Sequence, residues 1–556
     1  MKLSGTVVSI GVCVGVCTSA VASAGGLLLP GAGVVSTGRA GAAIASADDA
    51  EAIVLNPAGI AKSDGTVITF GADFITYALK FSRSGDYPAT VAGATPASFD
   101  GMRFPSMTNS PSPPLGLGSF QPVPLIGIVS DLHKVVKGLH VGFTIYAPNA
   151  YPFRNMNSVN GQSYYGHDSN GVYSLPTTYG AAPPPSRYDI IEQDAAIILP
   201  TIAVAYSILP NLDIGARFSA GYAELNSTTA VWGLTNFQED PKQDGIVTIK
   251  ATDDFVHTFG FGATYRPTPN IELAAQWSAP IDVHASGTAN SFNGPDVQVG
   301  MSSVTVQPKP DAMARCAPGG TAADLKACVD LEAAPMTATI GGRWKFLDDA
   351  GKMRGDVELN LGWEHWGAKC DYNNGLTSCV DPSNYHVTID GEVVSALAPT
   401  DPIPLSEQLI QHNLQDTYSA RVGGSWIFPV GANAVVARAG VSYDSAAAQN
   451  GWERLDLDGA ARTMLSLGAS YKLTRWSIDA GFSYIYEGSR TQNSNCAPST
   501  TTGCSSSGQQ QSFPNQAGAS PVNPVFQFNG QFEDPIDQGT FVSHYVLLDI
   551  GASLRF

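Results

Sequence analysis

Charged residues are scarce in this chain. Only 14% of its 556 residues are Asp, Glu, Lys or Arg, whereas soluble proteins average about 25%. No stretch beyond the N-terminus approaches the roughly 18 consecutive apolar residues that a membrane-spanning helix requires, and the mean hydropathy is only +0.01. The composition therefore argues against an ordinary soluble domain and against a bundle of membrane helices.

Catalytic motifs are also missing. The sequence contains no G-x-S-x-G elbow, no phosphate-binding loop, no H-E-x-x-H and no dinucleotide fingerprint. The nine histidines are scattered, so we predict no enzyme activity, no metal site and no cofactor. A lipase-like serine and histidine would be recognised only by their geometry. His257 is the candidate, but it shares a strand face with Phe259 and Phe261, as a packing or rim histidine does.

Positive charge is the third scarcity. The chain has 30 Lys and Arg against 48 Asp and Glu, a net charge of −18, so we expect no nucleic-acid partner. One of the lysines, Lys2, precedes an apolar run over residues 7–21 that ends at Ala22-Ser23-Ala24. This pattern predicts a signal peptide over residues 1–24. The alternatives are a membrane anchor, for which no stop-transfer flank follows, and a lipidated Cys17, which lacks the usual preceding leucine.

Six cysteines follow the predicted signal peptide, and they fall into three close pairs. An even number at short spacing in an exported protein predicts local disulfides. Free thiols or a metal site are the alternatives, although no C-x-x-C occurs. The predicted pairs are Cys316 with Cys328, Cys370 with Cys379, and Cys496 with Cys504.

Glycine and proline, in contrast, are abundant, with 58 and 37 residues, and they separate segments in which apolar and polar residues alternate. In the last segment Leu548, Ile550 and Leu554 lie on one face, while Asp549 and Arg555 lie on the other. A wall between lipid and a polar interior requires this pattern, because a Lys or Arg facing lipid near mid-membrane costs about 2–4 kcal/mol. We predict strands near residues 66–82, 124–131, 137–147, 195–208, 211–224, 254–266, 270–284, 335–346, 354–366, 416–428, 433–444, 461–473, 475–488 and 542–556.

These segments predict an all-β fold, a transmembrane antiparallel β-barrel of about fourteen strands over residues 66–556. A β-sandwich or solenoid would need a second sheet to cover the apolar face. Short links at one rim and long extracellular loops at the other are typical of an outer-membrane barrel, and the first strand should pair with the last. Within the loops we predict a short helix over residues 321–331. The predicted loops are residues 83–123, 149–190, 285–334, 367–415 and 489–540.

Residues 25–65 do not alternate. Small residues dominate the run GRAGAAIASADDAEAIVLNPAG over residues 38–59, which predicts a short helix over residues 49–54 that Asn56-Pro57 terminates. Such a segment ahead of the barrel could fold into the lumen as a plug. A disordered leader is the alternative, which the apolar clusters in this segment disfavour.

The run over residues 38–59 resembles the N-terminal hatch of the FadL-type long-chain fatty acid transporter family. Residues 259–281, 416–426, 437–444 and 548–556 resemble strands of the same family. The resemblance implies a monomeric, hatch-gated barrel in the outer membrane of a Gram-negative-type bacterium, which passively admits hydrophobic molecules. Long-chain fatty acids are the first expected substrates and aromatic hydrocarbons the alternative. A nonspecific porin, or an adhesin or structural barrel, is a further alternative.

The resemblance also implies roles for a few residues. Asn56, Pro57 and Ala58 correspond to hatch elements, with Asp48 and Asp49 as packing or hydrogen-bond partners. It identifies no ligand contacts. The terminal Phe556 resembles the C-terminal aromatic signal of such barrels, which implies the barrel assembly machinery as a partner, with outer-membrane lipid and lipopolysaccharide as the surroundings.

Overall fold

The structure of the protein is a computed structural model. It describes residues 27–556 except 88–95, 133, 168–172, 175–180, 232–240, 242–243, 294–303, 309–315, 317–324, 368–384, 396–397, 406–407, 411, 413, 449–452, 458, 493–525, 529–530 and 534–538. The predicted signal peptide lies outside the described residues. So do four of the predicted disulfide cysteines, Cys370, Cys379, Cys496 and Cys504.

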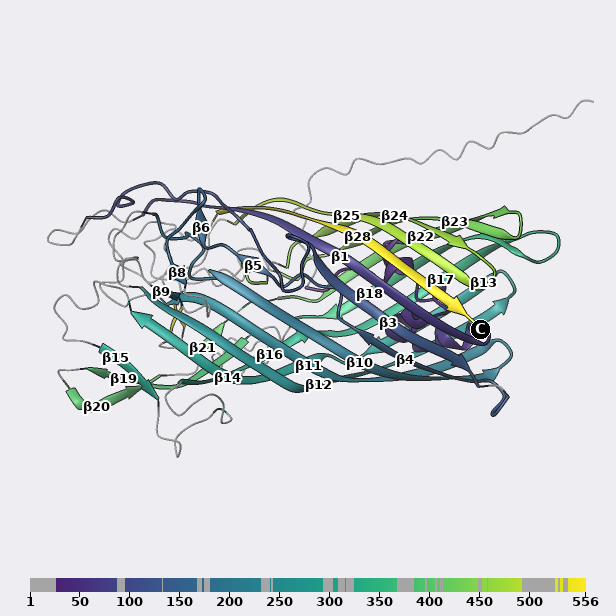
Figure 1. The fold of residues 1–556 in the computed structure, drawn as a ribbon, viewed down its shortest axis with the longest axis horizontal. Coiled ribbons are helices and arrows are strands. Elements are labelled where there is room, and N and C mark those ends of the chain that lie inside the picture. Colours follow the sequence, from purple (N-terminus) through teal and green to yellow (C-terminus); the bar gives the residue numbers. More distant parts are fainter. Residues whose placement is uncertain are drawn as a thin grey trace, which may run out of the picture.

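Fourteen antiparallel strands form a closed barrel (Figure 1), as the alternation predicts. Each strand pairs with the next, and the first pairs with the last from Val67 opposite Arg555 to Arg83 opposite Gly539. In ring order the strands are β1 (Thr66–Arg83), β3 (Gln121–Asp131), β4 (Leu139–Tyr146), β10 (Glu192–Leu209), β11 (Leu212–Val231), β12 (Gly245–Thr268), β13 (Ile271–Ser278) with β14 (Ile281–Asn293), β16 (Leu325–Ala334) with β17 (Met336–Leu347), β18 (Met353–His365), β22 (Thr417–Val430), β23 (Asn433–Asp444), β24 (Arg462–Lys472), β25 (Trp476–Gln492) and β28 (Gly539–Arg555).

Three sequence predictions are wrong in this part of the ring. The predicted strand over residues 270–284 is interrupted at Ala279-Pro280, since proline cannot donate to a strand ladder. The predicted loop over residues 285–334 contains most of β14 and all of β16. The predicted helix over residues 321–331 is also wrong, because residues 325–334 form β16, whose backbone pairs with β14 and β19 and so overrides the helical preference of its Ala and Leu residues.

The remaining strands are short or lie beyond the barrel ring. They are β2 (Met107–Thr108), β5 (Arg154–Asn155), β6 (Ser158–Val159), β7 (Gln162–Ser163), β8 (Gly166–His167), β9 (Tyr173–Ser174), β15 (Val304–Pro308), β19 (Tyr385–Ser395), β20 (Ala398–Pro404), β21 (Gln408–Ile410), β26 (Phe526–Phe528) and β27 (Gln531–Glu533). Most of them belong to the long connections at one rim, whereas the links at the other rim are short.

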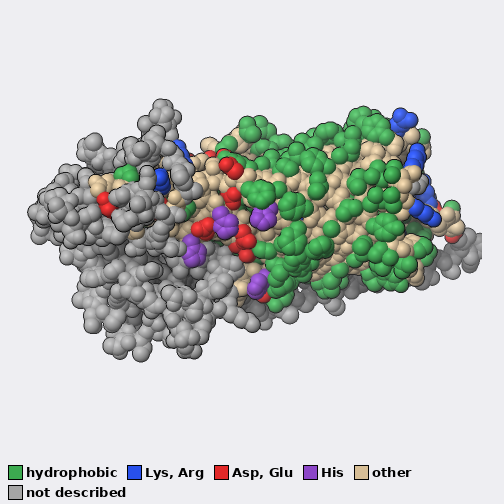
Figure 2. All heavy atoms as spheres, turned by 90° about the horizontal axis from the view of Figure 1, so that it is seen from below, with side chains coloured by type: hydrophobic (Ala, Val, Ile, Leu, Met, Phe, Trp, Pro, Cys, Tyr) green, Lys and Arg blue, Asp and Glu red, His purple; other side chains and the backbone are tan. Residues whose placement is uncertain are grey.

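The two faces of the wall have the predicted polarity. On β11, Ile214 and Phe218 are exposed outward, while Asp213 and Ser219 are fully buried inside. Figure 2 shows an apolar band across the outer wall, bounded by Lys and Arg at one end and by Asp, Glu and His at the other. Aromatic side chains border this band at both ends, as in membrane barrels. They are Tyr206, Tyr265, Trp344, Phe346, Trp426, Phe428, Tyr471 and Trp476 at the short-turn rim, and Phe255, Tyr418, Tyr443 and Tyr486 at the long-loop rim.

None of the helices in the described residues is long and apolar enough to cross a membrane. The short helices α1 (Val34–Thr37), α2 (Ala50–Leu55) and η1 (Pro57–Lys62) lie inside the barrel, where Figure 1 shows them in purple. His257 is exposed on the outer wall and its ring stacks on Phe255. It is therefore a rim histidine.

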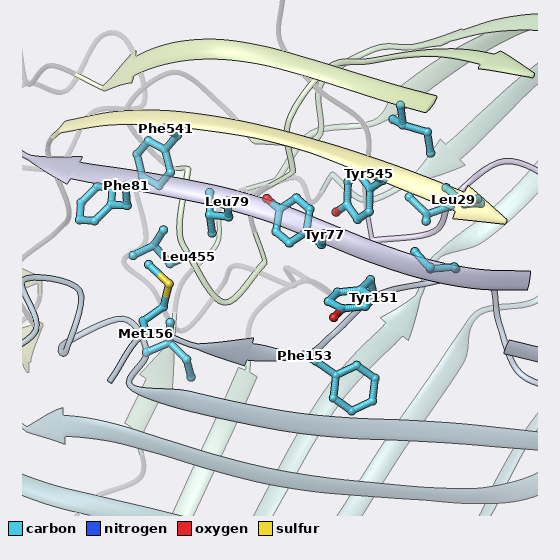
Figure 3. Packing of buried hydrophobic residues seen from close by; sticks show 14 of the residues in the cluster. Leu29, Tyr77, Leu79, Phe81, Tyr151, Phe153, Met156, Leu455, Phe541 and Tyr545 are labelled. Atoms are coloured by element: carbon cyan, nitrogen blue, oxygen red, sulfur yellow. The ribbon is translucent and has the colours of Figure 1, made fainter. Parts of the chain in front are cut away.

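Aromatic side chains fill the barrel toward the long-loop rim (Figure 3). The rings of Tyr77 and Tyr545 stack with centroids 4.3 Å apart, and Tyr151 and Phe153 approach them from the segment after β4. The guanidinium of Arg154 lies 4.5 Å from the centre of the Tyr77 ring. The lumen is therefore packed and not an open pore at this level.

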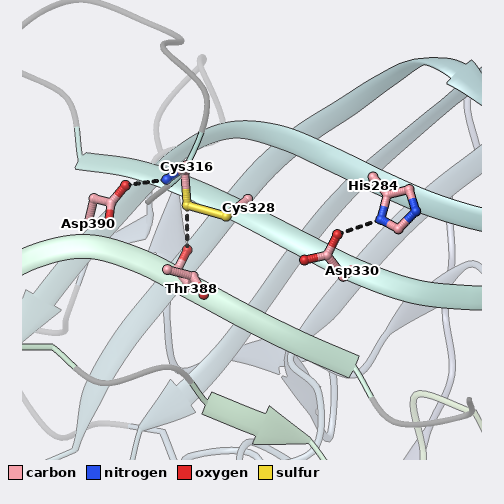
Figure 4. Close-up of a disulfide and its surroundings, with 6 residues drawn as sticks. All are labelled: His284, Cys316, Cys328, Asp330, Thr388 and Asp390. Carbon is pink, nitrogen blue, oxygen red and sulfur yellow. Dashed lines mark hydrogen bonds and ion pairs between the residues drawn. A yellow bond between two sulfur atoms is a disulfide. The ribbon is translucent and has the colours of Figure 1, made fainter. Parts of the chain in front are cut away.

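One predicted disulfide is present in the described residues, between Cys316 and Cys328 (Figure 4). The Cys316 amide donates to Asp390 Oδ2 at 2.7 Å, and its sulfur lies 3.5 Å from the Thr388 carbonyl oxygen. Asp390 and Thr388 belong to β19, so the disulfide links residue 316 to the β16–β19 pair at the long-loop rim.

Candidate functional site

The N-terminal segment, residues 27–65, folds around the Asn56-Pro57-Ala58 turn. The Asp49 side chain caps α2 by accepting from the Glu51 amide at 3.0 Å, which confirms the short helix predicted over residues 49–54. Asn56 ends α2 and caps η1, because its Oδ1 accepts from the Ala58 amide at 3.2 Å. Pro57 occupies the first position of η1, where its missing N–H costs nothing.

Asn56 also holds this segment against the wall. The side chain is fully buried, and its Nδ2 donates to the Ile44 carbonyl at 2.9 Å, the Ala263 carbonyl at 3.3 Å and the Thr264 hydroxyl at 3.3 Å. Ala263 and Thr264 belong to β12. The predicted hatch residue therefore joins two parts of the N-terminal segment to the barrel.

Glycines in the wall permit this close approach. A Cβ on Gly262 would collide with Asn56 Oδ1, and one on Gly215 would collide with the backbone of Pro57 and Ala58. The same relationship recurs around the barrel where other strands meet the N-terminal segment. The wall glycines whose Cβ would contact it are Gly71, Gly127, Gly142, Gly215, Gly262, Gly341, Gly423, Gly440, Gly468 and Gly551.

Arg39 forms the second attachment to the wall, which sequence reasoning missed. Its guanidinium is buried and pairs with Asp356 at 2.8 Å and Glu358 at 3.4 Å, and it also donates to Ser425. Glu358 in turn accepts from the Ala45 amide at 2.8 Å. A single arginine in a run of small residues was the available signal, but its carboxylate partners are more than 300 residues away in the sequence.

We expect Arg39→Gln to lower the thermal stability of the barrel strongly. Removing one partner of a buried ion pair costs up to about 3–5 kcal/mol, because Glu358 loses its cation, whereas Asp356 keeps Arg343 at 2.9 Å. Arg354→Gln is the matched control, since Arg354 is 42% exposed and its 3.3 Å pair with Asp348 should contribute less than about 1 kcal/mol. Heat-induced unfolding of the purified barrel measures the stability of both variants. Equal shifts of the unfolding temperature would contradict the role of Arg39 as an attachment to the wall.

Three acidic residues follow each other closely in the N-terminal segment. Asp48 is half-exposed and pairs with Arg555 at 3.6 Å. Burial raises the pKa of Asp49 to about 6, with the Asp48 charge as the second cause. Glu51 accepts from the Val35 and Ser36 amides at 2.8 Å each, yet its burial, followed by the Asp49 charge, raises its pKa well above the usual value. The predicted partners Asp48 and Asp49 therefore have different positions, one at the short-turn rim and one inside.

An apolar cavity, the upper cavity, lies between the N-terminal segment and the wall. It contains about 1140 Å3 of empty space, part of it open to solvent. Leu27 and Leu28 line it on the side of the N-terminal segment, and Asp456 and Leu457 line it from the β23–β24 connection. Alanine, valine, leucine and isoleucine side chains from β3, β10, β11, β14 and β16 form most of the wall. A space with this apolar lining suits a hydrophobic molecule.

A second cavity, the lower cavity, lies on the other side of the N-terminal segment, at the short-turn rim, and contains about 1050 Å3 of empty space. Charged side chains of both signs surround it. An apolar molecule would gain nothing by entering such a space, because ionic groups stay hydrated there. The charged lining residues are Arg39, Arg343, Arg438, Lys472, Arg475, Arg555, Asp48, Asp49, Glu51, Asp356 and Asp479.

The wall is interrupted beside the upper cavity. β4 pairs with β10 only as far as Tyr146 opposite Leu199, and the next pairing is between β5 and Gln193. Over residues 194–198, β10 has a strand partner in the described structure on its β11 side alone. The chain over residues 147–153 turns inward instead of continuing the wall. We call this interruption the β4 gap.

Prolines mark the opposite edge of the β4 gap. Residues 121–124 of β3 pair with β1 but extend beyond the end of β4. The Pro124 carbonyl accepts from the Ala147 amide at 3.2 Å, so this side of Pro124 faces the gap, and Pro122 has the same parity. Because proline has no N–H, it leaves fewer unpaired donors at a strand edge. Residues of both edges line the upper cavity, which therefore reaches the β4 gap.

A closed barrel with an internal N-terminal segment and an apolar cavity beside a wall interruption has the architecture of a membrane channel. The family model described as outer membrane protein transport protein (OMPP1/FadL/TodX) matches residues 15–528. The chain therefore belongs to this family of outer-membrane transport proteins and is a multi-pass β-barrel of the outer membrane. The family is one of channels and not of enzymes.

Solved structures share the fold at low sequence identity. A FadL homologue from Pseudomonas aeruginosa superposes with a TM-score of 0.61 at 15% identity, covering 96% of this chain and all of the other. The toluene transporters TodX of P. putida and TbuX of Ralstonia pickettii each give a TM-score of 0.54, at 14% and 16% identity, covering 95% of this chain and 99% of theirs. No curated protein matches the sequence significantly.

Proposed function

We propose that this protein passively transports hydrophobic molecules across the outer membrane, with residues 27–65 acting as the hatch. The upper cavity carries this proposal, because an apolar space of about 1140 Å3 ends at the hatch on one side and at the β4 gap on another. A ligand that enters from the long-loop rim would meet the charged lower cavity if the hatch opened straight through. The β4 gap offers an apolar alternative, from the upper cavity sideways into the membrane.

Diffusion along this route needs no energy source. Moving an apolar molecule from water into an apolar space is favourable by about 25 cal/mol per Å2 of buried surface. A continuous apolar path therefore avoids the free-energy cost of returning the molecule to water. Unpaired strand edges at membrane depth are tolerated only where they line a cavity or protein, which fits the position of the β4 gap. Asn56-Pro57-Ala58 and Arg39 keep the hatch docked during passage in this proposal.

Long-chain fatty acids are the first substrate class, as the family resemblance implies. Aromatic hydrocarbons are the second, and one observation favours them. Glu224, Glu332 and Asp456 are the acidic residues that line the upper cavity, and its described lining contains no Lys, Arg or His. The lining therefore offers no cation to a fatty acid carboxylate. Two solved structures with this fold are named toluene transporters.

Uptake of labelled oleate and labelled toluene tests the proposal in cells with and without the protein. We expect the protein to raise uptake of at least one of them about tenfold or more, and to leave uptake of a hydrophilic sugar unchanged. Oleate uptake would support the fatty acid class, and toluene uptake alone the aromatic class. Sugar passage without hydrophobic uptake would instead indicate a nonspecific porin and contradict the proposal.

A further inference from the structure

Two aspartates face each other where the barrel closes. Asp73 of β1 lies directly opposite Asp549 of β28, and the two side chains are only 1% and 4% exposed. Both point into the barrel toward the hatch. One Asp73 oxygen accepts from the Thr37 hydroxyl of α1 at 3.2 Å. The pair therefore connects the closing seam of the barrel with the hatch.

The Gly33 amide also contacts the Asp73 carboxyl group, but these donors from the hatch do not satisfy the remaining carboxyl oxygens of the pair. Asp73 Oδ1 and both oxygens of Asp549 are buried without a donor among the described residues. The polar group that meets Asp549 is the Asp73 carboxyl group itself. Two carboxyl groups can hydrogen-bond to each other only through a proton, so one shared proton would satisfy oxygens of both aspartates where they face each other across the seam.

Among the described residues, no Lys, Arg or His forms an ion pair with Asp73 or Asp549. Glu51 and Asp49 of the hatch and Asp479 of β25 add negative charge on this side of the lumen. Arg438 of β23 is one cation on this side of the lumen, and it contacts Asp479 at 3.9 Å and Ser470; Arg555 acts on Asp49. Glu51 is occupied by the Val35 and Ser36 amides. Two ionised carboxylates at the seam would therefore face each other and a third carboxylate in a dry environment.

We propose that Asp73 and Asp549 form a proton-binding site that holds one shared proton, and that this proton keeps the hatch docked on the seam. The inference rests on the proposed role of residues 27–65 as the hatch. Release of the proton to water leaves two carboxylates whose repulsion is relieved when α1 withdraws and water enters. A proton bound more tightly in the docked than in the undocked state stabilises docking at low pH, so docking weakens as the pH rises.

Infrared spectroscopy of the full-length protein in lipid nanodiscs tests the proton directly. We expect a protonated carboxyl absorption at neutral pH that loses one component in Asp549→Asn and in Asp73→Asn, while any component from Glu51 remains. Asp213→Asn is the matched control, since Asp213 is equally buried on an inward face but pairs with Arg266 at 2.5 Å. The lost component should persist in this control. A wild-type absorption that neither Asp549→Asn nor Asp73→Asn reduces overturns the proposal.

Proteolysis of the hatch tests the consequence over a range of roughly pH 5 to 9, which spans ordinary titrations of perturbed carboxyl groups. Cleavage within residues 27–65 should increase about tenfold or more with pH in the wild type and in Asp213→Asn. It should be independent of pH in Asp549→Asn, whose amide supplies the missing donor. A pH step that persists in Asp549→Asn, or cleavage that follows sodium or calcium concentration instead of pH, would overturn the shared proton. If neither oleate nor toluene is transported but the absorption component and the pH step are present, the proton site stands and the transport proposal fails.

Discussion

Gly262→Val should release the hatch from the wall and make the barrel permeable to hydrophilic solutes. A side chain at this position occupies the place of Asn56 Oδ1, and overpacking of a filled site typically costs about 1–3 kcal/mol. The displaced Asn56 would also lose its bonds to the Ile44 carbonyl and to β12, each of which contributes about 0.5–1.5 kcal/mol. We expect entry of a hydrophilic dye or large antibiotic to rise about tenfold or more.

Gly342→Val is the matched control. Gly342 is also a wall glycine in the middle of a strand, but its Cβ would meet only the Leu273 side chain, at 3.7 Å. This variant should retain wild-type permeability, and its hatch should resist protease. If both variants are equally leaky, the effect comes from a general loss of strand packing. If neither is leaky, the Asn56 contact does not hold the hatch.

The strands could be predicted because the membrane imposes a local rule on the sequence. On β11 and β28 every second residue must be acceptable to lipid, so alternation alone identifies the strand and its faces. The closure of β1 on β28 then follows, since a whole strand edge cannot be left unpaired against lipid. The prediction over residues 321–331 was wrong for the complementary reason. Its Ala and Leu residues favour a helix locally, whereas the partners β14 and β19 that make it a strand are distant in the sequence.

The site was less accessible to sequence reasoning. The end of the helix at Asn56-Pro57 could be predicted, because a turn signal is local, whereas the hatch role of Asn56, Pro57 and Ala58 rests on the family resemblance. Arg39 could not be identified from the sequence, because its carboxylate partners on β18 approach it only when the barrel wall has folded around the hatch. The prolines at positions 122 and 124 gave a signal that was not used. Two prolines separated by one residue lack their N–H groups on the same side of a strand, which predicts that this side is an unpaired edge. A closed barrel has an unpaired edge only where the wall is interrupted.

A single bulky side chain at the β4 gap should strongly reduce uptake of the transported hydrophobic molecule. Ala196 lies within the unpaired stretch of β10 and lines the upper cavity, so Ala196→Trp should obstruct the lateral path. We expect uptake of the transported hydrophobic molecule to fall about tenfold, equivalent to roughly 1.4 kcal/mol in the barrier. Binding of the same molecule to the purified protein should fall much less, since most of the upper cavity is unchanged.

Ala437→Trp provides the comparison for this variant. Ala437 is an exposed alanine on β23, where the wall pairs without interruption with β22 and β24. A tryptophan there faces lipid and should leave uptake unchanged. Equal loss in both variants would show that assembly or folding is impaired. Full uptake in Ala196→Trp would show that the ligand leaves by another route, past the hatch and through the charged lower cavity, and lateral exit through the β4 gap would then be wrong.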